Sequence, residues 1–206
     1  MPNNLTSPRI LLWSGSQRKD SLNTQLLEQL ALDIPATFQV ERLDAAALQL
    51  PLFDQDLEAQ PVPLQWALRL HAQVSRCDAI VLGSPEYNGQ ITPYLKNTVD
   101  WMSRLPYLDP NLGNPFLDRP VLLCSASPSW SGGSGGLAHA RSLFAYVGAM
   151  VLGDTVSVPF ADQCASDWGF VWDPAVQERA MFSLSRLLQQ ATYFKSHRTD
   201  QSWRMY

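Results

Sequence analysis

Small, hydroxyl and cationic residues follow the first apolar segment of the chain and have the composition of an anion-binding site. The apolar segment is Ile10 to Trp13, and the sequence after it is SGSQRKDSLN (residues 14–23). Leucines then recur at helical spacing from Leu22 to Leu30, which predicts an amphipathic helix. The first turn of a helix has unpaired backbone N–H groups and the positive end of the helix dipole, so its start predicts a phosphate site.

Four side chains in this segment suit a phosphate group. Ser16, Ser21 and Asn23 can donate hydrogen bonds. The guanidinium group of Arg18 adds a full charge and a fork of donors that matches phosphate oxygens. The alternative is a polar turn without a ligand, in which Ser21 only caps the helix. The segment alone leaves both interpretations open.

A second polar and aromatic segment follows the apolar run AIVLGS (residues 79–84). This run is short and contains β-branched residues, which predicts a parallel strand covered on both faces. Pro85 ends the strand, and the loop Glu86 to Gly89 leads to a helix that begins at Thr92 and Pro93. Open α/β sheets bind their ligands at the carboxyl ends of the strands, which is where this loop is expected.

A third loop follows the apolar run VLLCS (residues 121–125). Its sequence is ASPSWSGGSGG (residues 126–136), and a helix with an apolar face from Leu137 to Val147 comes next. The glycines allow backbone conformations that other residues avoid and let a ligand approach the main chain closely. A flexible turn without a function is the alternative, but the position after a buried strand favours a ligand site.

The remaining segments complete an alternating order of strands and helices. Further strands are predicted at 38–43 and 151–160, and further helices at 63–76 and 174–195. This order predicts an α/β fold with three layers, in which helices cover a five-stranded parallel sheet of order 2-1-3-4-5. The three loops would then meet at one edge of the sheet. We expect a single domain, residues 1–206, with a polar arm (1–8) and a polar tail (196–206).

Composition excludes several classes of function. The chain has 206 residues, a net charge of −4 and no broad basic segment, so binding to nucleic acid has no support. It has no apolar run of about 20 residues and no signal sequence, so we expect no membrane insertion and a cytoplasmic location. The three cysteines lack metal-ligand spacing and are interpreted as reduced thiols, and no metal site is expected.

Two motifs resemble those of the NADPH-dependent FMN reductase family, a flavodoxin-like group that includes quinone, azo-dye and chromate reductases. GSQRKDSLN (15–23) is similar to the family's GSxRxxSxN phosphate loop, and SPEYNGQITPYLKNTVDW (84–101) is similar to its PEYN and LKNxxDW segment. The resemblance implies that FMN is bound by three groups of residues. They are the phosphate loop (Ser16, Arg18, Ser21, Leu22, Asn23), the ring loop (Pro85, Glu86, Tyr87, Asn88, Gly89) and the third loop (Ser127, Trp130, Gly132, Gly133). Trp130 departs from the family pattern, which has a small residue there.

The resemblance also implies a function. NADPH or NADH passes a hydride to FMN, and the electrons then leave to a small-molecule acceptor such as a quinone, an azo compound, free flavin or a metal oxyanion. No side chain is expected to act as a catalytic group, because the flavin supplies the chemistry. Two alternatives remain: a flavodoxin-like electron carrier or flavin-binding regulator that never meets NAD(P)H, and a flavin-free interaction domain.

The helix predicted at 92–104 carries Tyr94, Val99, Trp101 and Met102 around most of its circumference. This is more apolar surface than a helix packed on one sheet needs, so we expect a homodimer or a homotetramer. The family resemblance points to the same surface and to the loop Leu50 to Leu57 as a cover for the partner's flavin. The alternative is that Trp101 belongs to the core of its own chain.

Overall fold

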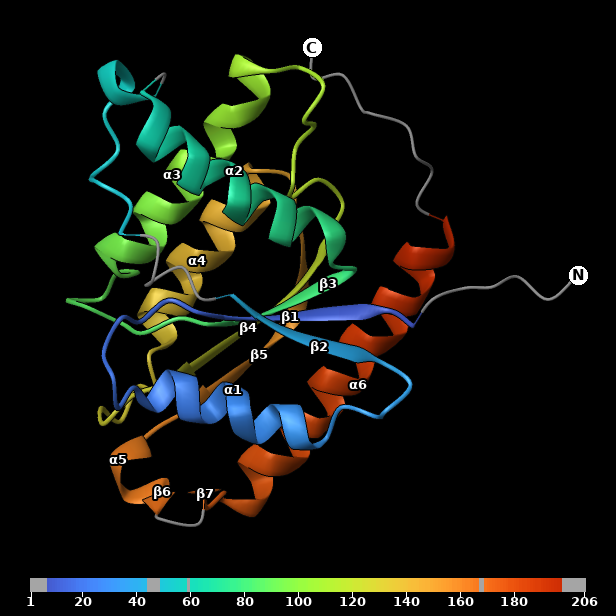
Figure 1. Cartoon of the computed structure of the whole chain (residues 1–206). Helices are drawn as coiled ribbons and strands as arrows, with labels where there is room; N and C mark the ends of the chain where they lie inside the picture. Colours follow the sequence, from blue (N-terminus) through green and yellow to red (C-terminus); the bar gives the residue numbers. More distant parts are fainter. Residues whose placement is uncertain (1–6, 44–48, 59, 167–168, 198–206) are drawn as a thin grey trace, which may run out of the picture.

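The computed structural model describes residues 7–43, 49–58, 60–166 and 169–197, and these contain a five-stranded parallel sheet (Figure 1). The strands lie in the order β2-β1-β3-β4-β5, and all neighbouring pairs are parallel. Their bounds are β1 Arg9–Ser14, β2 Gln39–Leu43, β3 Ala79–Gly83, β4 Pro120–Ala126 and β5 Met150–Val158. The predicted fold class and strand order are confirmed.

Helices cover both faces of this sheet (Figure 1). One face carries α1 (Leu22–Leu32) and α6 (Pro174–His197), and the other carries α2 (Pro61–Arg76), α3 (Pro93–Leu108) and α4 (Ser134–Tyr146). Strands β3 and β4 are buried along their whole length between these layers, which explains why their sequences are continuous apolar runs. No helix in the described part of the chain is long and apolar enough to cross a membrane.

The loop 50–57 is held on α3 by two side chains of the LKNxxDW segment. Asn97 Nδ2 and Trp101 Nε1 both donate to the carbonyl of Pro51, at 2.9 and 2.8 Å, and the N–H of Phe53 donates to Asn97 Oδ1 at 2.6 Å. Trp101 is only 1% exposed, and its ring meets that of Phe53 edge to face. Trp101 is therefore a core residue of its own chain.

Burial of Val99, Trp101 and Met102 corrects the predicted surface of α3. All three side chains are buried inside the chain, in two of its apolar clusters. The predicted apolar excess on this helix is explained by packing on two sides, against the sheet and against the loop 50–57. These residues consequently do not form an outer contact surface.

Element boundaries differ from the prediction in several places. Helix α4 begins at Ser134, inside the predicted glycine loop, and α3 continues past Pro106 to Leu108. Strand β5 ends at Val158. Short elements were not predicted: η2 (Gln55–Leu57), α5 (Ala161–Cys164) and the hairpin of β6 (Ala165–Ser166) and β7 (Gly169–Phe170). Helix α6 includes residues 196 and 197 of the predicted tail, whereas 1–6 of the arm and 198–206 of the tail lie outside the described residues.

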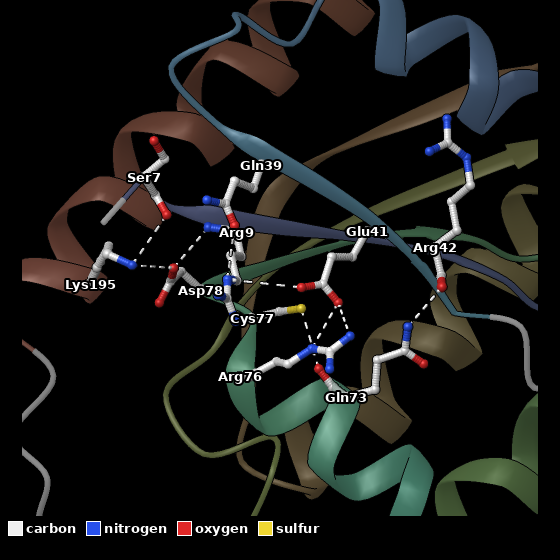
Figure 2. A network of polar contacts seen from close by, with 10 residues as sticks. All are labelled: Ser7, Arg9, Gln39, Glu41, Arg42, Gln73, Arg76, Cys77, Asp78 and Lys195. Atoms are coloured by element: carbon white, nitrogen blue, oxygen red, sulfur yellow. Dashed lines mark hydrogen bonds and ion pairs between the residues drawn. The ribbon is translucent and has the colours of Figure 1, made fainter. Parts of the chain in front are cut away.

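Charged side chains tie elements together at the amino ends of the strands (Figure 2). The carboxylate of Asp78, which is 3% exposed, accepts hydrogen bonds from the backbone N–H of Arg9 at 2.8 Å and from Lys195 Nζ at 3.3 Å. Arg76, at the end of α2, forms an ion pair with Glu41 of β2. These contacts join α6, β1, β2 and α2 at this edge, and the loops that bear the candidate site lie at the opposite edge.

Candidate active site at the carboxyl edge of the sheet

Three loops meet where β1, β3 and β4 end, as the sequence predicted. The N–H of Gly15 donates to the carbonyl of Gly83 at 2.8 Å, and Thr92 Oγ1 donates to the carbonyl of Gly15 at 2.7 Å. The N–H of Ser84 donates to the carbonyl of Cys124 at 2.8 Å. These hydrogen bonds join the first loop to the second and the second to β4, so residues distant in sequence form one site.

The first loop presents donors at the start of α1. Ser21 Oγ accepts a hydrogen bond from the N–H of Thr24 at 3.3 Å, so Ser21 does cap the helix. The N–H groups of Leu22 and Asn23, in the first helical turn, have no acceptor among the residues that the structure describes. Arg18 is exposed, and its Nη2 donates to the carbonyl of Asp20 at 2.6 Å. Ser21 can therefore cap the helix while the N–H groups of Leu22 and Asn23 stay available to bind an anion.

Asn23 has a structural role that the sequence did not indicate. Its side chain is buried, with Nδ2 donating to the carbonyl of Ala126 at 2.9 Å and Oδ1 accepting from the N–H of Ala126 at 3.0 Å. This pair of hydrogen bonds joins the first turn of α1 to the end of β4. Asn23 thus fixes the spacing between the first loop and the third, and its predicted contact with phosphate stays a prediction.

The second loop is a tight hairpin built on an Asn-Gly pair. Tyr87 and Gln90 exchange two backbone hydrogen bonds, at 2.9 and 3.0 Å. Asn88 and Gly89 have φ angles of +53° and +76°, as the mirror-image turn of a two-residue hairpin requires. Asn88 and Gly89 therefore shape the turn, and Tyr87 stands beside it with 52% of its surface exposed.

Glu86 joins the second loop to the third. Its Oε2 accepts a hydrogen bond at 2.7 Å from the N–H of Gly136, in the first turn of α4. A carboxylate at this end of a helix is favoured by the helix dipole. A Cβ on Gly136 would lie 3.2 Å from the Cβ of Glu86, so the glycine permits the close approach. Gly135 and Gly136, the last two glycines of the run, are thus packed against Glu86.

The third loop uses its first two glycines for the turn into α4. Gly132 and Gly133 have φ angles of +59° and +81°, and a Cβ on Gly133 would overlap Ser125 Oγ. Ser157 Oγ donates to the carbonyl of Gly132 at 3.0 Å and fixes the loop on β5. Trp130 lies at the tip of this loop, 80% exposed. The loop is held at its base and presents an aromatic ring at its tip.

Buried hydroxyl groups lie beneath the second and third loops. Ser84 Oγ and Ser125 Oγ are fully buried, and neither has a hydrogen-bond partner among the described residues. Ser84 follows β3 directly and Ser125 lies near the end of β4. Buried polar groups are normally satisfied, so these hydroxyls have hydrogen-bonding capacity to spare at this edge. Together with the free N–H groups of α1 and the glycine turn, they fit a polar, phosphate-bearing cofactor.

Two of the three thiols, those of Cys77 and Cys124, are buried. Burial raises the pKa of Cys77 to about 12 and also raises the pKa of Cys124. Both groups are therefore neutral near pH 7 and unreactive. Among the residues that are described, no group of three or more His, Cys, Asp or Glu side chains is placed to hold a metal ion.

Residues 8–163 match the model of the family named NADPH-dependent FMN reductase. The chain belongs to this family. A quinone reductase of Escherichia coli is 33% identical over 138 residues, which are 67% of this chain and 70% of that protein. An NAD(P)H-dependent FMN reductase of Pseudomonas aeruginosa is 29% identical over 139 residues, 68% of this chain and 70% of the relative.

Solved structures show the same fold. The flavoenzyme FerB, an NAD(P)H:(acceptor) oxidoreductase of Paracoccus denitrificans, has a TM-score of 0.73 at 22% identity and covers 91% of this chain and 98% of its own. An azoreductase of Bacillus anthracis has a TM-score of 0.56 at 15% identity, with coverage of 90% and 99%. The predictions of a flavodoxin-like fold, of FMN as the cofactor and of NAD(P)H-dependent oxidoreductase activity are confirmed by the family match.

Proposed function

We propose that this reductase passes electrons from NADPH or NADH through FMN to flat aromatic acceptors of the quinone class. The observation that carries the proposal is the pair of exposed rings beside the site, Tyr87 at 52% and Trp130 at 80% exposure. Aromatic rings favour stacking with planar acceptors over contact with small oxyanions. The similarity to relatives that are named quinone reductase and NADPH:quinone oxidoreductase supports the same class of acceptor.

The residues of the three loops are proposed to bind and orient the cofactor. FMN, when bound, supplies the hydride acceptor and the electron donor of the reaction. Arg18, Ser16 and the free N–H groups of α1 are the proposed phosphate donors. The hairpin at Tyr87 and the turn at Gly133 are proposed to contact the ring system, and the turn requires glycine because a Cβ at residue 133 would overlap Ser125 Oγ.

Glu86 and Asn23 act in this proposal through other groups. Glu86 holds the start of α4, and Asn23 holds the end of β4, each by hydrogen bonds to backbone groups. They set the distances between the loops and are positioning residues. No role in the reaction is proposed for His71 or His139, which are hydrogen-bonded to the carbonyl of Gly113 and to the side chain of Gln90.

The assembly and the location of the protein are proposed as well. A groove of about 620 Å³ runs between α3 and α4 and is lined by apolar, charged and aromatic side chains, among them Pro93, Lys96, His139 and Tyr146. We infer that a second copy of the chain covers it and forms a homodimer, alone or as half of a tetramer. The three free thiols support residence in the reducing cytoplasm.

Anaerobic reduction tests the proposed function. The FMN-loaded protein is mixed with NADPH or NADH without oxygen, and the flavin absorbance is followed. Bleaching with either nucleotide, then recovery on addition of 1,4-naphthoquinone, is the expected result. An electron carrier that does not meet NAD(P)H would keep its absorbance with both nucleotides, and that outcome would contradict the proposal.

The acceptor class is tested with Trp130→Ala. Loss of one aromatic contact is expected to raise the Michaelis constant for 1,4-naphthoquinone about three- to tenfold, with little change in flavin reduction by NAD(P)H. The Michaelis constant for chromate is expected to change less. Tyr193→Ala, which removes an exposed ring from α6, is the matched control. An unchanged quinone constant in Trp130→Ala would show that this ring does not contact the acceptor.

A further inference from the structure

Phe160 has a backbone conformation that its side chain disfavours. It follows β5 by two residues and has a φ angle of +49°. This left-handed region is uncommon for residues with a Cβ and is an outlier for bulky ones. The other described non-glycine residues with positive φ are Gln49, Asn88 and Asp118, all polar. Phe160 is thus the aromatic exception in the described chain.

Hydrogen bonds on both sides impose this conformation. The N–H of Phe160 donates to the carbonyl of Ser129 at 3.3 Å, and the N–H of Ala161 donates to the carbonyl of Ser127 at 3.0 Å. The carbonyl of Phe160 accepts from the N–H of Gln163 at 3.0 Å. The turn is therefore fixed by the third loop and by α5, and a glycine or an asparagine would adopt it with less strain.

Burial does not explain why phenylalanine occupies the turn. The ring of Phe160 is 48% exposed, whereas the next residue, Ala161, is fully buried in the core. About half of the surface of the residue thus stays in water, so the turn lacks about half of the stabilisation that full burial of a phenylalanine would bring. Strain that persists without a packing reason is a feature of ligand-binding sites.

The backbone of Phe160 lies against the third loop. Its hydrogen bond to Ser129 places it beside Trp130, and a Cβ on Gly132 would lie 2.9 Å from the N atom of Pro159, so the two segments touch. Two exposed aromatic side chains therefore stand on bonded neighbouring loops at the carboxyl edge of the sheet. This is the edge that carries the candidate flavin site.

We propose that Phe160 is a specificity-determining residue, which together with Trp130 forms an aromatic contact for planar acceptors. The inference rests on the proposed function and adds a residue of β5's loop to it. Phenylalanine is kept at a position that favours glycine or asparagine because its ring binds the acceptor. Binding specificity is thus gained at the expense of local stability.

The test compares Phe160→Asn with Phe160→Tyr in the FMN-loaded protein. Asparagine fits the turn but lacks the ring, so we expect an unchanged or higher Tm and a Michaelis constant for 1,4-naphthoquinone that is about three- to tenfold higher. The constant for chromate is expected to change less than twofold. Tyrosine keeps the ring, so Phe160→Tyr should have a Michaelis constant for 1,4-naphthoquinone close to that of the wild type. Phe182→Asn, which removes an exposed phenylalanine from α6, is the matched control and should change neither constant.

A second measurement separates this inference from the proposed function. Binding of 1,4-naphthoquinone to the oxidised protein is followed by quenching of tryptophan fluorescence without NAD(P)H, so it does not depend on turnover. Weaker binding of the quinone to Phe160→Asn than to wild type supports the inference. A loss of binding free energy in the double variant with Trp130→Ala that is smaller than the sum of the two single losses supports a contact shared by both rings. Equal binding to wild type and Phe160→Asn overturns the inference, even where the wild type reduces quinones. Failure of the wild-type flavin to bleach with NAD(P)H overturns the proposed function instead.

Discussion

The guanidinium group of Arg18 is held in place by the loop to which it belongs. Its Nη2 and Nε donate to the carbonyl of Asp20, at 2.6 and 3.2 Å, while the side chain remains exposed. These hydrogen bonds orient the charge before any ligand arrives, so less conformational entropy is lost on binding. The charge lies in the loop that leads to the two free N–H groups of α1.

Arg18→Ala tests the proposed phosphate contact. A charged hydrogen bond contributes about 1.5 to 3 kcal/mol, so the affinity for FMN is expected to fall about tenfold or more. Riboflavin lacks the phosphate, and its affinity should change little. Titration of the apoprotein with both flavins, followed by flavin fluorescence, provides the measurement. Lys19→Ala removes an exposed charge from the same loop and is the control, which should lower the affinity for FMN less. Equal losses of affinity for FMN and riboflavin in Arg18→Ala would exclude the phosphate contact.

Residue roles could be predicted only where they depend on local sequence. The cap at Ser21, one of the two interpretations of its segment, follows from a short-range rule and agrees with the structure. The Asn-Gly turn at 88–89 follows from such a rule as well, although only a loop was predicted there. The contacts of Asn23 with Ala126 and of Glu86 with Gly136 join residues 103 and 50 positions apart. Such partners depend on which loops the sheet order brings together, so the sequence alone did not identify them.

At the scale of elements, uniform packing made helices and strands predictable. Strand β3 is buried along its whole length and helix α6 buries one face, and their positions were predicted to within a few residues. The first turn of α4 was missed because Gly135 and Gly136 have low helix propensity. This turn is helical because the Glu86 carboxylate binds its free N–H, a contact from another loop.

His71 links α2 to the segment that joins α3 to β4. Its Nε2 donates to the carbonyl of Gly113 at 2.9 Å, and its Nδ1 lies 3.4 Å from Ser75 Oγ. Burial lowers the pKa of His71 below 6.5; the hydrogen bond to Gly113 opposes this shift, and the charge of Arg119 adds to it. The folded protein therefore favours the neutral imidazole.

This shift predicts how stability depends on pH. The unfolded chain binds a proton at His71 near pH 6.5, whereas the folded chain does so only at lower pH. Stability from this group is thus complete above pH 6.5 and is lost as the pH falls through the folded pKa. Urea unfolding between pH 7.5 and 5 should show a smaller fall in the free energy of unfolding for His71→Gln than for wild type. Equal slopes for wild type and His71→Gln would contradict the prediction.

At the scale of the whole molecule, the two edges of the sheet have different roles. The amino edge is closed by ion pairs and hydrogen bonds among Asp78, Lys195, Arg76 and Glu41 (Figure 2). The carboxyl edge carries the three loops, free backbone donors and exposed rings. The groove between α3 and α4 is lined by Gln90 and Ile91 of the second loop, so a subunit seated in it would lie beside the site.

The proposed homodimer predicts a specific oligomeric state. Tyr146 lines this groove and is 90% exposed in the single chain, and Leu143 and Val147 add apolar surface next to it. A stable dimer buries about 1,200–2,000 Å² in total, with aromatic side chains contributing strongly near the centre. Sedimentation at micromolar concentration should therefore give a species of about 46 kDa, twice the 23.0 kDa chain, or a multiple of it.

Tyr146→Asp is expected to weaken this association at least tenfold, because it places an unpaired charge in the interface. Tyr193→Asp makes the same exchange at an exposed tyrosine of α6, away from the groove, and should leave the sedimentation coefficient unchanged. A partner subunit that completes the flavin site would make the affinity for FMN depend on association. Dissociation of the Tyr146→Asp variant would then lower this affinity, whereas the Tyr193→Asp variant would keep the wild-type affinity. A wild-type species of 23 kDa at micromolar concentration would contradict the dimer, and equal dissociation by both substitutions would place its interface elsewhere than the groove between α3 and α4.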